Sequence, residues 1–145
     1  MKRVLFLAYL FFMISCVQNK EKQGTTKNSI SEKPAGITEI TFNEEIHDFG
    51  KLVSGEIVVS TFTFTNSGKQ NLTIKNIDAG CGCLQVKYPK TAVKPGKTGL
   101  IEVEFDSSGM FGRQYKTIEI HANCKEPKHL AIFAIVKNEN LEIKY

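Results

Sequence analysis

The sequence predicts an all-β domain, an immunoglobulin-like antiparallel β-sandwich of about seven strands, preceded by a signal peptide and a flexible tether. From Ile37 onward, apolar and polar residues alternate with a period of two, which is the spacing of strands with one buried face. Gly, Pro and Asn interrupt this alternation at intervals of roughly 8 to 14 residues, and no segment has a convincing helical pattern. The roughly 109 residues after position 36 suffice for one such domain, and a small barrel is the alternative architecture.

The expected strands follow from this alternation. Segment 57–65 is the clearest, because Phe62 and Phe64 fall on one face while Val59 falls on the other. Segment 130–136 is apolar throughout, which suits a strand covered on both faces. In chain order, the expected strands are 37–42 (the weakest), 57–65, 72–77, 84–88, 100–105, 115–122 and 130–136.

Turn residues separate these strands. Residues 66–69 are expected to turn the chain and close a hairpin after Phe64. The sequence Lys-Pro-Gly at 94–96 suits a type II turn, in which Pro fixes φ and Gly96 takes the positive φ. Gly109 and Gly112 bracket a further reversal. Since Trp is absent, the likeness to antibody domains concerns architecture alone.

Residues 1–15 have the pattern of a bacterial lipoprotein signal peptide. Lys2 and Arg3 precede the eleven-residue apolar segment 4–14, which is too short to span a membrane because a helix needs about 20 residues for that. The residues that end at Cys16 resemble a lipobox, which makes Cys16 the expected site of lipidation. The alternative is an ordinary secretory signal. The protein is therefore expected in the cell envelope, lipid-anchored outside the cytoplasm as a periplasmic or outer-membrane lipoprotein.

Residues 16–36 are polar and are expected to form a disordered tether, so residues 37–145 make up the sandwich domain. Removal of the signal leaves 17 basic and 15 acidic residues. No cluster of Lys and Arg with interleaved aromatic residues is present, which excludes the usual nucleic-acid binders. The expected contacts are the membrane, through the lipid, and an envelope protein or polymer.

Six short phrases stand out in the predicted domain: His47-Asp48-Phe49-Gly50-Lys51, Gly55-Glu56, Phe62-Thr63-Phe64-Thr65-Asn66-Ser67-Gly68, Cys81-Gly82-Cys83, Lys94-Pro95-Gly96 and Ile101-Glu102-Val103-Glu104-Phe105. In this order they resemble a family of exported bacterial proteins labelled domain of unknown function 1573, over residues 42–136. The resemblance implies a small immunoglobulin-like sandwich, related in shape to the Hydin-like and major sperm protein groups and common in lipoproteins of the Bacteroidota type. No enzymatic activity is established for the family. Cys124 departs from the family pattern, in which a small or polar residue is expected.

Cys81, Cys83 and Cys124 remain once Cys16 is assigned to the lipid, and they lie in a compartment that permits disulfides. A bridge between Cys81 and Cys83, or from either to Cys124, is one interpretation. A second is a soft-metal site for copper or zinc, in which these thiolates are joined by His121 or His129. Thiol redox chemistry is a third, although no helix is predicted that would lower a thiol pKa.

The function expected from these features is that of a non-catalytic, lipid-anchored module that binds or spaces other envelope components, with no cofactor. The alternative is a thiol-redox or soft-metal protein centred on Cys81 and Cys83. A hydrolase is the least favoured class, because no nucleophile or acid motif surrounds any of the three histidines. No catalytic residue is therefore assigned.

Overall fold

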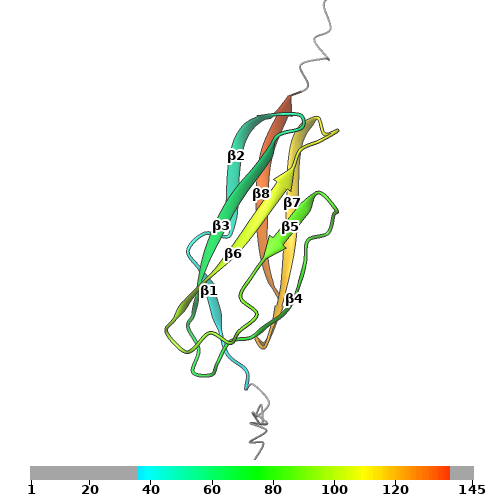
Figure 1. Cartoon of the computed structure of the whole chain (residues 1–145). Coiled ribbons are helices and arrows are strands. Elements are labelled where there is room, and N and C mark those ends of the chain that lie inside the picture. Colours follow the sequence, from blue (N-terminus) through cyan, green and yellow to red (C-terminus); the bar gives the residue numbers. More distant parts are fainter. Residues whose placement is uncertain (1–35, 138–145) are drawn as a thin grey trace, which may run out of the picture. The chain divides into compact units, whose positions relative to one another are not determined.

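The computed structural model describes residues 36–137, which form a sandwich of two four-stranded sheets (Figure 1). One sheet has the strand order β1-β3-β6-β5 and the other β2-β8-β7-β4. The expected signal peptide, Cys16 and nearly all of the expected tether lie outside the described residues. The strands are β1 (Ile40–Phe42), β2 (Ile46–Val53), β3 (Ile57–Asn66), β4 (Ile74–Asp78), β5 (Leu84–Lys87), β6 (Thr98–Asp106), β7 (Gly112–Ala122) and β8 (Lys128–Lys137).

The core lies between the two sheets and is built from the alternating residues of the strands. Phe64 and Phe105 of one sheet and Ile132 of the other are completely buried. Each such side chain contributes roughly 1.5–3 kcal/mol by leaving water. Every buried apolar residue of this core falls between Ile40 and Val136, so the sandwich carries a complete core of its own. The all-β sandwich predicted from the period of two is confirmed, and the described residues include no helix that could cross a membrane.

Strand β2 was not predicted, and it makes the second sheet mixed rather than purely antiparallel, because β2 runs parallel to β8. Only Leu52 of this edge strand is buried, so no alternation marks it in the sequence. The register shifts between Asp48 and Lys51, where Gly50 takes a φ of 70° and its N–H donates to the Asp48 carboxylate at 2.7 Å. Phe49 nevertheless packs inward, with its ring 6.4 Å from that of Phe105.

The prediction of a hairpin after Phe64 was wrong, because β3 and β4 belong to different sheets. Residues 67–73 instead carry the chain across the sandwich. Within this crossing Leu72 forms only an isolated bridge with Val93, and β4 begins at Ile74. The turn at Lys94 has the predicted geometry, since Lys97 N–H donates to the Lys94 carbonyl at 3.0 Å and Gly96 has a φ of 71°.

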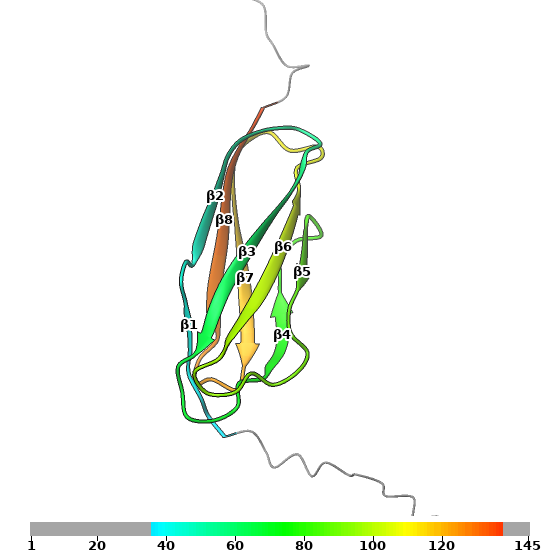
Figure 2. The same cartoon turned by 60° about the vertical axis from the view of Figure 1, so that its left-hand side comes forward.

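The chain joins and leaves the sandwich at opposite ends (Figures 1 and 2). Residue 36 lies at the end formed by segments 36–39, 67–73, 89–97 and 123–128, which we call the basal end. Strand β8 finishes at the opposite end, beside segments 54–56 and 107–111, where Ser54 N–H donates to the Lys137 carbonyl at 2.8 Å. We call this the far end.

Candidate functional site

Asn66 fastens the loops of the basal end to one another. Its side chain is completely buried at the end of β3. The amide nitrogen donates to the carbonyls of Gln70 and Val93, at 2.7 and 2.8 Å. The amide oxygen accepts from the Thr38 hydroxyl at 2.9 Å and from the Gly68 N–H at 3.1 Å. All the hydrogen-bonding capacity of this amide is therefore used, as a buried polar group requires.

Asn123 forms a similar set of hydrogen bonds where the N-terminal chain joins the domain. Its amide nitrogen donates to the carbonyls of Gly36 and Asn71, at 2.7 and 2.9 Å, and its oxygen accepts from the Thr73 N–H at 2.8 Å. Thr38 N–H donates to the Asn123 carbonyl at 3.0 Å. Residues 36–38 are thus hydrogen-bonded to the rest of the sandwich, so a force on the N-terminal chain acts directly on the folded domain. Sequence reasoning missed Asn123, and nothing in its neighbourhood marks it as a buried amide.

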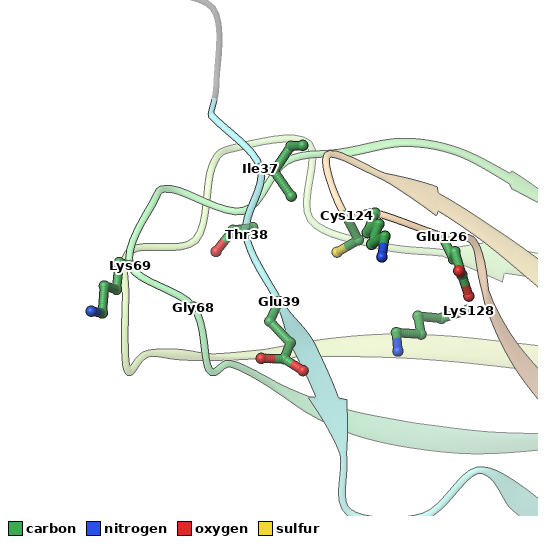
Figure 3. A pocket seen from close by; sticks show the side chains of 9 residues that line it. Ile37, Thr38, Glu39, Gly68, Lys69, Cys124, Glu126 and Lys128 are labelled. Atoms are coloured by element: carbon green, nitrogen blue, oxygen red, sulfur yellow. The ribbon is translucent and has the colours of Figure 1, made fainter.

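A groove lies beside this junction, between the leading segment 36–39, the β3–β4 connection and the β7–β8 turn (Figure 3). Cys124 faces it as a free thiol, with Lys69 and Lys128 on the groove walls. Partial burial raises the pKa of the Cys124 thiol, although the positive charge of Lys128 opposes the shift. A thiol in this state is a poor nucleophile at neutral pH, because the thiolate is the reactive form.

Cys81 and Cys83 form a disulfide in the connection between β4 and β5, with their Cα atoms 5.3 Å apart. Both are half-buried and pack against the core, whereas Gly82 between them is exposed. Asp106 N–H donates to the Cys83 carbonyl at 3.0 Å, which places this loop beside the far end of β6. Of the arrangements considered from the sequence, the structure therefore contains the short bridge and leaves Cys124 apart.

Replacing both Cys81 and Cys83 with Ser is expected to lower the free energy of unfolding by only about 1.5 kcal/mol. The bridge closes a loop of three residues, and chain entropy assigns so short a loop little stabilisation. Urea denaturation of the double variant beside the oxidised wild type measures the difference. A loss above about 4 kcal/mol would show that the bridge holds the two sheets together rather than one loop.

The residues considered as metal ligands do not come together. Gly80, beside the disulfide, lies near the Thr117 carbonyl in the middle of β7. Cys124 lies seven residues after Thr117, just beyond the end of β7, which is roughly 20 Å away along an extended chain. His129 pairs with Glu119 across β7 and β8, and Glu119 in turn lies 3.5 Å from His121 on the outer surface. Among residues 36–137, no three His, Cys, Asp or Glu side chains are grouped so that they could hold a metal ion.

Ser107 organises the far end. The Ser107 side chain is buried. Its hydroxyl donates to the Glu56 carbonyl at 2.8 Å and accepts from the Gly55 N–H at 3.1 Å. This joins the β2–β3 turn to the β6–β7 connection. Large apolar side chains are nevertheless exposed here, with Phe111 65% and Ile57 60% accessible. Ile37 of the basal end is also exposed, at 73%, so exposed apolar side chains occur at both ends.

Comparison with known proteins places the sequence in one family. The model of the family described as "Protein of unknown function (DUF1573)" matches residues 40–136, which is most of the chain. Comparison with curated proteins gives no match.

Solved structures share the fold. A protein of unknown function from Porphyromonas gingivalis W83 is 19% identical with a TM-score of 0.62, and the match covers 74% of this chain and 51% of that one. The chain thus spans about half the length of that protein. The VesB protease of Vibrio cholerae is 15% identical, with a TM-score of 0.56 and coverages of 68% and 31%. The PapD-like domain 7 of human CEP192 is 10% identical, with a TM-score of 0.55 and coverages of 70% and 87%. At these identities the likeness concerns the fold alone.

Proposed function

The chain belongs to the DUF1573 family of proteins of unknown function, and from this premise we propose that it is a non-catalytic, lipid-anchored module of the cell envelope. In this proposal Cys16 carries the lipid, and the sandwich binds or spaces another envelope protein or polymer outside the cytoplasm. The chemistry of residues 36–137 supports a binding role more than a catalytic one, because the histidines lie on strand surfaces or edges and the free thiol is partly buried.

The observation that carries this proposal is the place where the chain joins the domain. The chain that follows Cys16 reaches the sandwich at the basal end, where Asn123 bonds its backbone. Gly36 lies twenty positions after Cys16, a reach of at most about 70 Å. The far end, with Phe111 and Ile57 exposed, is then the part directed away from the anchor and open to a partner.

Replacing Cys16 with Ser is expected to abolish lipid attachment, because the thiol of this residue is the group that the lipid modifies. Growth with radioactive palmitate, followed by membrane fractionation, measures both labelling and retention. The matched control is Cys124→Ser, which removes another cysteine and should leave labelling unchanged. Continued labelling of the Cys16→Ser protein, or a wild type that is never labelled, would refute the anchor.

Thiol–disulfide exchange at Cys81 and Cys83 is the second candidate function. It is favoured by the presence of a disulfide between two cysteines that are only two positions apart in the sequence. A dithiol protein would supply the electrons: its thiolate attacks one sulfur, a mixed disulfide forms, and its second thiol resolves that bond. The partner then holds a disulfide, and Cys81 and Cys83 are thiols. Titration of free thiols and metal analysis of the purified protein test whether Cys81 and Cys83 serve as a thiol or metal site. Copper or zinc bound stoichiometrically, and lost in the Cys81→Ser/Cys83→Ser variant, would overturn both the exchange and the simple binding module.

A further inference from the structure

Lysines gather at the basal end. The four segments that form it contain six lysines and two glutamates, a surplus of four positive charges, although the chain after the expected signal peptide is nearly balanced. Five of these lysines are exposed and the sixth is half-buried. They come from three connections far apart in the sequence, so no run of basic residues marks them. The lysines are Lys69, Lys90, Lys94, Lys97, Lys125 and Lys128, and the glutamates are Glu39 and Glu126.

The hydrogen bonds of the basal end hold these connections side by side. Asn66 binds the carbonyls of residues 70 and 93, and its own backbone bonds to Gly96 and Lys97, so the loops of Lys69 and of Lys94 are joined. Asn123 bonds to the same β3–β4 connection from the turn that carries Lys125. Within the described part of the chain, none of the six lysines takes part in a salt bridge. Four of these charges are therefore exposed and not neutralised by ion pairs, those of Lys69, Lys94, Lys97 and Lys125. The Lys90 ammonium lies 3.4 Å from the centroid of the Tyr88 ring, and Lys128 is half-buried.

The far end provides the contrast. Its segments 54–56 and 107–111 contain one charged residue, Glu56, and Lys137 at the end of β8 balances that charge. Positive charge is thus concentrated at the end where the N-terminal chain arrives, and not at the other. Charges act over about one Debye length, roughly 8 Å at physiological salt, so only a surface that the basal end touches would feel them.

We propose that the basal end is a docking surface for anionic lipid headgroups. This rests on the proposed function, since a lipid on Cys16 would keep the domain within about 70 Å of the membrane with its basal end leading. The lysines then bring the basal end onto the headgroups, and the sandwich stands on the membrane with Phe111 and Ile57 of the far end facing outward. The occupant fits by charge, because a surface of negative headgroups matches exposed ammonium groups spread over three loops.

The test uses the lipid-free chain 17–145, which contains the whole core, so that binding does not depend on the anchor. It is sedimented with vesicles of phosphatidylcholine containing 30 mol% phosphatidylglycerol, and with vesicles of phosphatidylcholine alone. Binding to the anionic vesicles is expected, together with its loss in 0.5 M salt. Replacing Lys69, Lys94, Lys97 and Lys125 with Gln should weaken this binding on the order of 1,000-fold, since each lysine near such a surface contributes about fivefold.

The control variant removes the same charge elsewhere, by replacing Lys51, Arg113, Lys116 and Lys137 with Gln on β2, β7 and β8. It should keep most of the binding. Circular dichroism checks that both variants stay folded, as expected because seven of the eight replaced side chains are exposed and Lys116 is half-buried. Equal losses in the two variants, equal binding to neutral vesicles, or no binding to anionic vesicles would each overturn the docking surface. Palmitate labelling of Cys16 tests the anchor separately, so failure of one does not imply failure of the other.

Discussion

Replacing Asn66 with Ala is expected to lower the free energy of unfolding by about 3 kcal/mol or more. The change removes the four hydrogen bonds of the side chain, and each contributes about 0.5–1.5 kcal/mol. The Gln70 carbonyl keeps the Thr38 hydroxyl as a donor, the Val93 carbonyl keeps the Leu72 N–H, and the Gly68 N–H keeps the Glu39 carbonyl. The estimate stays near the lower end of the sum because loops at the surface can admit water to some of these groups. Urea denaturation with linear extrapolation measures the difference.

Two further variants separate hydrogen bonding from volume. Asn66→Asp keeps the size and the acceptor oxygen but loses both donated bonds, so it should lose most of the same stability at neutral pH. Asn76→Ala removes an exposed amide from β4 and should change stability by less than about 0.5 kcal/mol. An Asn66→Asp protein as stable as the wild type would mean that the donated bonds do not hold the basal loops.

Much of the fold could be predicted from the sequence because strands with one buried face show it directly. In β3, the buried Phe62 and Phe64 alternate with exposed or half-buried residues, and β6 repeats the pattern with Ile101, Val103 and Phe105. Strand β2 escaped prediction because it is an edge strand interrupted by a bulge at Gly50. The alternation with a period of two reflects burial of one face of a strand. A strand that buries only one residue therefore shows almost no alternation in its sequence.

The basal end could not be predicted for a different reason. Asn66 was interpreted as part of a turn, which its hydrogen bond to Gly68 N–H supports, but its bonds to Thr38 and Val93 span 28 and 27 residues. Lysines 69, 94 and 125 likewise become neighbours only through the crossing of the chain between sheets. In the same way, sequence reasoning identified Cys81, Cys83 and Cys124 as candidates, whereas the structure decides which of them are close.

Replacing Phe64 with Ala is expected to cost about 3–5 kcal/mol of unfolding free energy, the largest effect of any single change considered. Phe64 is completely buried on β3, opposite Gly99 of β6, and its ring lies 6.0 Å from that of Phe42. Truncation removes the ring from the core and leaves a cavity that two paired strands cannot collapse to fill. Thermal and urea unfolding of the purified variant measure the loss.

Gly99 supplies the partner test, because a Cβ at this position would clash with the Phe64 ring. Gly99→Ala alone should cost about 1–3 kcal/mol, since the buried ring has nowhere to move. In the Phe64→Ala background, the methyl group that Gly99→Ala adds enters the space that the ring left. The loss of stability caused by Gly99→Ala should then fall to zero or become a gain. Gly82→Ala, where an added Cβ meets nothing within 4 Å, is the matched control and should be nearly neutral. Additive costs for Phe64 and Gly99 would refute direct packing of the ring on the glycine, because contacting residues are expected to couple.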